Sequence, residues 1–107
     1  MAKQESGPWL VSFSGKAEKQ KEKLPETIKS ALNLLRRELE EEGPERRNWP
    51  HYGPVKGQGK NVDLRHCHLN KGRTVYVAVW LVVDNVRRIL EVRYAGTHEN
   101  ADYRRIS

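Results

Sequence analysis

The sequence predicts a small α+β domain in which one or two helices pack on one face of an antiparallel sheet. Three observations lead to this prediction: a β-prone segment near the N-terminus, one strongly amphipathic helical segment, and three β-prone segments in succession at the end. The chain has 107 residues, enough for one core, and its apolar residues, 36% of the total, are concentrated in these segments. We therefore expect residues 9–107 to form a single domain, preceded by a flexible N-terminus over residues 1–8.

The first strand is expected at residues 9–13, where Trp9, Val11 and Phe13 share one face. Ser14-Gly15 ends this strand, and the charged segment that follows is expected to form a short helix that breaks before Pro25.

A longer helix is predicted from Leu24-Pro25 to Gly43-Pro44. Proline is tolerated at the first helical position, whereas the final glycine supplies a left-handed cap and the proline after it prevents continuation. Apolar residues recur at helical spacing at Leu24, Ile28, Ala31, Leu32, Leu35 and Leu39. A solvated face is the preferred interpretation of the acidic residues near its end, and an acidic recognition site is the alternative: Glu38, Glu40, Glu41 and Glu42.

A long connecting loop is expected over residues 48–59, which are rich in glycine and proline. Three strands should follow as an antiparallel meander, at residues 62–69, 73–83 and 88–96. Both faces of the middle strand are apolar, so this strand is expected at the centre of the sheet. In the last strand, Leu90, Val92 and Tyr94 are expected on the helix side, with Arg93 on the face that the helices leave partly open.

The excess positive charge lies in the second half of the chain. The net charge is +6, and residues 48–107 contain ten basic and five acidic residues, whereas residues 16–47 contain nine and eight. A basic, strand-rich half is typical of a surface that binds polyanions. The lone Cys67 excludes an intramolecular disulfide, and no apolar run approaches the ~20 residues of a membrane span, so we expect a cytoplasmic location without membrane association.

Three histidines, His66, His68 and His98, are the strongest candidates for chemistry, because an imidazole can move protons near neutral pH. His66 and His68 are two apart on a strand and should share a face, with Cys67 on the other face. The alternatives are structural histidines, or a zinc site that His66 and His68 form with Cys67 or His98. Basic residues that suit a phosphodiester surround the histidines: Lys56, Lys60, Arg65, Lys71, Arg73, Arg93, Arg104 and Arg105.

The order and spacing of several segments resemble the RelE/ParE toxin superfamily, and HigB-type and related RelE-like toxins in particular. The segments that carry the resemblance are Leu24-Pro25, Gly43-Pro44, Arg65-His66-Cys67-His68-Leu69, Gly72-Arg73, residues 77–83, Tyr94-Ala95-Gly96-Thr97-His98-Glu99 and Tyr103.

This resemblance implies a ribosome-dependent messenger-RNA endonuclease that a cognate antitoxin holds inactive. Such toxins need no metal or cofactor, and they cleave by attack of the 2′-hydroxyl on the adjacent phosphate, which gives a 2′,3′-cyclic phosphate. The antitoxin is expected to be a small protein with a helix-turn-helix DNA-binding region.

The resemblance also assigns roles to residues. His66 and His68 stand where RelE proper has two lysines, His98 stands where it has an arginine, and Arg73 and Tyr103 lie beside an arginine and a tyrosine of the family. The implied catalytic set is His66, His68, Arg73, His98 and Tyr103, with the acid and the base left open. Messenger and ribosomal RNA would contact a second set, which comprises Lys56, Lys60, Arg65, Lys71, Arg93 and Arg104.

Three alternatives remain at this point. The ParE branch poisons DNA gyrase and does not cut RNA, although its members generally lack this set of histidines. A non-catalytic RNA-binding module would need only the charge, and a chain without activity would only bind an antitoxin-like partner.

Overall fold

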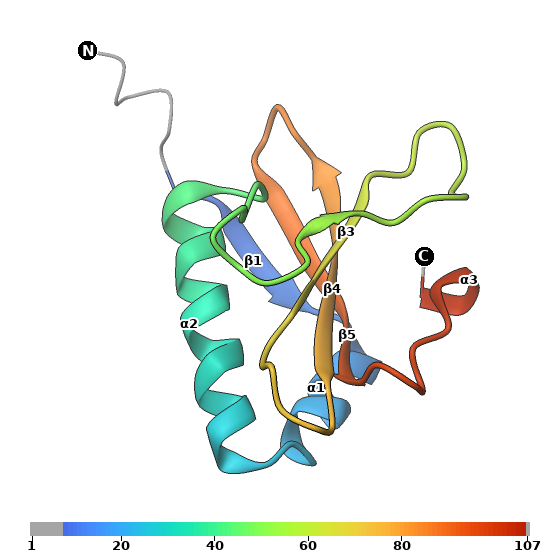
Figure 1. Cartoon of the computed structure of the whole chain (residues 1–107). Coiled ribbons are helices and arrows are strands. Elements are labelled where there is room, and N and C mark those ends of the chain that lie inside the picture. Colours follow the sequence, from blue (N-terminus) through green and yellow to red (C-terminus); the bar gives the residue numbers. More distant parts are fainter. Residues whose placement is uncertain (1–7, 107) are drawn as a thin grey trace.

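The computed structural model describes residues 8–106, which form an α+β fold (Figure 1). The predicted flexible N-terminus therefore lies, except for Pro8, outside the described residues. The helices and strands follow in the order β1 (Leu10–Phe13), α1 (Gly15–Glu22), α2 (Glu26–Glu42), β2 (Gly53–Pro54), β3 (Leu64–His68), β4 (Tyr76–Asp84), β5 (Ile89–Thr97) and α3 (Tyr103–Ile106).

The five strands form one sheet in the order β1-β5-β4-β3-β2, so the predicted meander is confirmed and β4 is its central strand. The prediction of a purely antiparallel sheet is wrong, because β1 pairs in parallel with β5. Parallel strands need a long crossover, and α1 and α2 supply it between β1 and the meander. The loop over residues 48–59 also contains a short edge strand, β2, which pairs with Arg65 and His66.

Both ends of α2 lie within a residue or two of the predicted positions. Pro25 takes the N-cap position, one residue before the helix, and Glu26 opens it. Gly43 ends it with a φ of 93°, where side chains are strained, and a Cβ on this glycine would lie 3.0 Å from the Trp9 indole nitrogen. Glycine is therefore required here by backbone conformation and by space.

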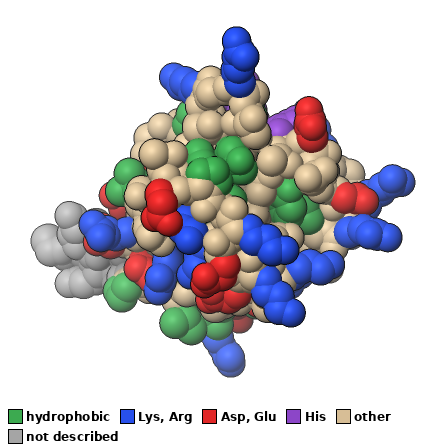
Figure 2. Space-filling view, turned by 90° about the horizontal axis from the view of Figure 1, so that it is seen from below, with side chains coloured by type: hydrophobic (Ala, Val, Ile, Leu, Met, Phe, Trp, Pro, Cys, Tyr) green, Lys and Arg blue, Asp and Glu red, His purple; other side chains and the backbone are tan. Residues whose placement is uncertain are grey.

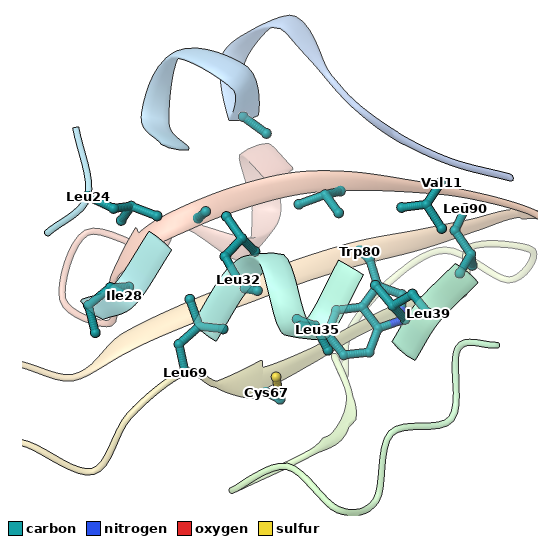
Figure 3. Close-up of a cluster of buried hydrophobic side chains, with 14 residues drawn as sticks. Val11, Leu24, Ile28, Leu32, Leu35, Leu39, Cys67, Leu69, Trp80 and Leu90 are labelled. Atoms are coloured by element: carbon teal, nitrogen blue, oxygen red, sulfur yellow. The ribbon is translucent and has the colours of Figure 1, made fainter. Parts of the chain in front are cut away.

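The main core lies between α2 and the sheet (Figure 3). Leu35 and Leu39 of α2 lie beside Trp80 on β4, and Leu32 lies further along the same helix; all four side chains are fully buried. Trp80 therefore belongs to the core of the protein. No helix within residues 8–106 is long and apolar enough to cross a membrane.

A second, smaller apolar cluster lies on the other face of the sheet, formed by Leu64, Val77, Val79 and Tyr94. The chain after β5 packs on this cluster through Ala101, Tyr103 and Ile106, so this face is partly covered by α3.

The expected position of Tyr94 on the helix side is wrong. Val79 pairs with Tyr94 and Trp80 pairs with Val92, which leaves Arg93 as the extra residue of a β-bulge. The bulge shifts the alternation by one residue, so Tyr94 joins the second face.

Candidate active site

Two of the three predicted histidines lie close together, where two strands of the sheet end. The strands β3 and β5 flank β4 and run in the same direction, so their carboxyl ends lie on the same side of the sheet. His68 is the last residue of β3, and His98 directly follows β5, where its amide donates to the Val75 carbonyl at 2.8 Å. Their ring centroids are 5.4 Å apart in an edge-to-face arrangement.

A cavity of about 340 Å³ lies beside this pair. Its wall comes from the ends of β3 and β5 and from the turn between β3 and β4, and it comprises His68, Arg73, Thr74, Val75, Thr97, His98 and Glu99. Arg73 is exposed and forms no ion pair within residues 8–106, so its guanidinium is available to an anion in this cavity. Figure 2 shows histidine side chains at the surface, with acidic and basic side chains next to them.

The end of β5 is shaped by Tyr94 and Gly96. The Tyr94 hydroxyl donates to the Thr97 carbonyl at 2.7 Å. A Cβ at residue 96 would lie only 2.7 Å from the same hydroxyl oxygen. Glycine at this position therefore leaves room for the hydrogen bond, two residues before His98.

His66 shares its face of β3 with His68, as predicted, and contacts Tyr103 of α3 at a centroid distance of 5.9 Å. Its Nδ1 lies 2.9 Å from the carbonyl oxygen of Gly53 on β2. Because a carbonyl only accepts hydrogen bonds, Nδ1 must carry the proton, and the lone pair of neutral His66 is on Nε2. The edge strand β2 thus fixes the tautomer of His66.

The surroundings favour the neutral form of two histidines. Burial lowers the pKa of His66 and His68, and nearby histidines lower both pKa values further. The Gly53 carbonyl partly opposes the shift of the His66 pKa. Burial also raises the pKa of the Tyr103 phenol. Near pH 7, His66 and His68 are therefore able to accept a proton, and Tyr103 remains a hydrogen-bond donor.

Sequence reasoning missed a fourth histidine at the site. His51 lies in the turn before β2, and its ring stacks on that of His68 with centroids 4.1 Å apart and an interplanar angle of 28°. The Pro50 carbonyl accepts the His68 amide at 2.8 Å, which joins this turn to β3. The only signal in the sequence is that all four histidines lie in the second half of the chain.

The turn that carries His51 is anchored to α2 through Glu38. The Glu38 carboxylate accepts hydrogen bonds from Arg46, Asn48 and Trp49 at 3.1, 2.9 and 2.8 Å. The interpretation of the acidic residues as a solvated face is therefore wrong for Glu38, whose side chain is only 20% exposed.

The predicted RNA-contact residues fall into two groups. The structure leaves the first group exposed, without ion pairs within residues 8–106: Lys56, Lys60, Lys71 and Arg104. The other two are occupied within the protein. Arg65 binds Asp63 through two hydrogen bonds of 2.9 Å and the Tyr52 hydroxyl at 3.0 Å.

Arg93 is the second occupied residue. It forms an ion pair with Glu91 and donates to the Ile106 carbonyl at 3.5 Å. It lines a separate cavity with Lys16 and Arg105, so the structure brings neither Arg65 nor Arg93 to the cavity beside His68 and His98.

Cys67 lies on the helix side of β3, fully buried, and burial raises the pKa of its thiol to about 12. The predicted alternation of Cys67 and the two histidines is confirmed, and Cys67 cannot join them in a zinc site without a change of face. No group of three or more metal-ligating side chains suited to an ion occurs in the described part of the chain.

Comparison with known proteins identifies the fold. No protein-family model matches the sequence, and no curated protein sequence matches it. Solved structures that resemble the chain include the archaeal RelE–RelB complex from Pyrococcus horikoshii OT3, with a TM-score of 0.68 at 18% identity over 88% of this chain and 99% of that chain. A mutant of the E. coli toxin RelE in the free state has a TM-score of 0.60 at 18% identity over 88% of this chain and 87% of that chain.

These likenesses define the class of fold as α+β with a mixed five-stranded sheet. The chain has the RelE-like toxin fold, and the fold family predicted from the sequence is confirmed.

Proposed function

We propose that this protein is the toxin of a type II toxin-antitoxin system and cleaves messenger RNA on the ribosome as a metal-independent endoribonuclease. The observation that carries this proposal is the His68–His98 pair, with ring centroids 5.4 Å apart, at a cavity that Arg73 also lines. This pair lies on a fold shared with structures named as RelE toxins, which supports the toxin class.

The proposed reaction is a transesterification. The 2′-hydroxyl attacks the adjacent phosphorus while His68, kept neutral by burial, accepts the hydroxyl proton. The bond from phosphorus to the 5′-oxygen breaks as His98 donates a proton to that oxygen, and Arg73 offsets the charge that develops on the phosphorane. The products are a 2′,3′-cyclic phosphate and a 5′-hydroxyl end.

His66 and Tyr103 complete the proposed site. His66 presents its Nε2 lone pair on the same face as His68, and the protonated phenol of Tyr103 lies at the edge of the His66 ring. Both groups suit hydrogen bonds to the ribose or phosphate next to the cleaved bond.

The exposed cations supply affinity for the RNA backbone. Lys56 and Lys60 lie in the loop before β3, Lys71 lies in the turn after it, and Arg104 lies on α3. Contacts of such residues with phosphates are independent of sequence and weaken with salt. Messenger and ribosomal RNA are the proposed partners, in the cytoplasm.

A cognate antitoxin is the proposed protein partner. One structural neighbour is a RelE–RelB complex, which supports a partner that binds the toxin directly. We propose a small protein with a helix-turn-helix region. An acidic or apolar segment of this protein would cover the surface that carries the exposed cations.

Primer extension on a defined message in a purified translation system tests this function. The unaltered protein should cleave in phase with codons, only when ribosomes are present, and cleavage should survive a chelator.

His98→Ala and Arg73→Ala should each reduce cleavage by roughly 100-fold or more. Arg87→Ala is the matched control, because Arg87 is an exposed arginine in the turn before β5, at the opposite end of that strand. No cleavage by the unaltered protein, together with inhibition of DNA gyrase, would overturn the proposal in favour of a ParE-like activity.

A further inference from the structure

We propose that His51 is a positioning residue of this site, whose imidazole packs on the His68 ring and holds that ring in place for proton transfer. The proposal rests on the function proposed above, because it gives His51 a role that acts through His68.

The contact between His51 and His68 is the tightest between histidine rings in the described chain. The two rings stack with centroids 4.1 Å apart, whereas His98 approaches His68 edge-on at 5.4 Å. His68 is therefore held by one imidazole on its face and by another in an edge-to-face contact. His51 does not line the cavity, so it reaches the substrate position only through His68.

The backbone holds His51 in an unusual conformation. Its φ is 55°, in the left-handed region that few residues other than glycine adopt, although asparagine, aspartate and histidine do so more often than the rest. The turn is kept in place by the hydrogen bonds from Asn48 and Trp49 to Glu38 and by that from the His68 amide to the Pro50 carbonyl. The fold thus keeps His51 in a fixed position against His68.

The charges around His68 explain what the stack does. Two protonated imidazoles in face-to-face contact repel each other, so a proton on His51 opposes a second proton on His68. The other groups that face His68 are His66 on the same strand, His98 after β5, and Arg73 and Glu99 on the cavity wall. Glu99 is the only anion among them. After burial, His51 is the largest of the influences that lower the pKa of His68.

Two substitutions separate the ring from its charge. His51→Phe keeps an aromatic ring on His68 but cannot be protonated. His51→Asn removes the ring and tolerates the positive φ, so it keeps the turn without the stack. The pair ensures that a failure of one variant to fold leaves the other as a test.

The first readout is the titration of the His68 ring, followed by NMR in the free, full-length protein. The midpoint of the His68 titration should move to higher pH in both variants, because neither carries the ionisable imidazole that lowers the His68 pKa. An unchanged midpoint in both variants would overturn the proposal. This measurement needs no RNA, so its outcome is independent of whether the protein is a ribonuclease.

The second readout is the pH profile of RNA cleavage. His51→Phe should keep activity at pH 8 and lose roughly threefold or more at pH 6, because more of His68 is already protonated. His51→Asn should lower kcat across the whole range, since the His68 ring is no longer held, and KM should stay constant in both variants. A rise in KM with an unchanged pH profile would show that His51 contacts RNA directly, and would contradict a positioning role.

Discussion

Three consecutive residues of β3 have different chemistry because successive side chains of a strand point to opposite faces. His66 and His68 lie on the face of the cavity, whereas Cys67 between them is fully buried under α2. The same tripeptide thus places two imidazoles on the face of the cavity and one thiol in the core. A shift of one residue in the pairing of β3 would exchange these roles.

The first prediction concerns the Cys67 thiol. Its pKa is raised to about 12 by burial, so at pH 8 both access and thiolate formation oppose reaction with a disulfide reagent. We expect negligible labelling of the folded protein and complete labelling in denaturant, as measured by release of the coloured thiol. Rapid labelling of the folded protein would place Cys67 on the exposed face and contradict the pairing of β3.

At the scale of elements, the end of α2 positions the site although it contributes no residue to the cavity. Glu38, near the end of α2, accepts hydrogen bonds from three side chains of the segment that leads to His51. Burial raises the pKa of Glu38, but hydrogen bonds from Asn48, Trp49 and Arg46 outweigh burial and lower it overall. The helix is thereby connected to the turn that stacks on His68.

The second prediction follows from this connection. Glu38→Ala should lower the free energy of unfolding by about 1–3 kcal/mol, because it leaves the partly buried Arg46 and Trp49 donors without their acceptor. Glu41→Ala is the control, since Glu41 is exposed and forms no ion pair in the described chain. Urea denaturation measures both. Equal stability of the two variants would show that the turn does not depend on α2.

Local periodicity predicted most of the fold. The stripe of apolar residues in α2 and the alternation in β4 are set by neighbours in sequence, so both elements were found with nearly correct bounds. The parallel pairing of β1 with β5 was missed because it joins residues about 80 apart, and the bulge at Arg93 because it depends on the partner strand. His51 was missed for a similar reason: its contact with His68 arises from the path of a loop that has no periodic pattern.

At the scale of the whole molecule, the main core and the proposed active site lie on opposite faces of the sheet. One face packs on α2 and forms the main core, whereas the other carries the histidines and is partly covered by the C-terminal segment (Figure 1). Partial burial of these imidazoles favours their neutral form, which can accept a proton. It also makes the stability of the fold sensitive to pH.

The third prediction is this sensitivity. The pKa values of His66 and His68 are lower in the folded chain than the ordinary value of 6.5, so the unfolded chain binds more protons as the pH falls through and below 6.5. Stability should therefore be full above neutral pH and decline between pH 7 and pH 5, as measured by urea denaturation across this range. The double variant His66→Gln, His68→Gln should show a flatter dependence. A gain in stability on acidification of the unaltered protein would contradict the depressed pKa values.

In the proposed reaction, the 2′-hydroxyl of the RNA is the nucleophile and the His68–His98 pair transfers the protons. The most direct test uses a message with a single 2′-deoxy nucleotide on the 5′ side of the cleaved bond, in the purified translation system with chelator present. We predict that this one substitution abolishes cleavage at that bond while neighbouring codons are still cut, and that the normal message yields 2′,3′-cyclic phosphate ends. Cleavage of the 2′-deoxy bond at the normal rate would exclude the 2′-hydroxyl as the nucleophile.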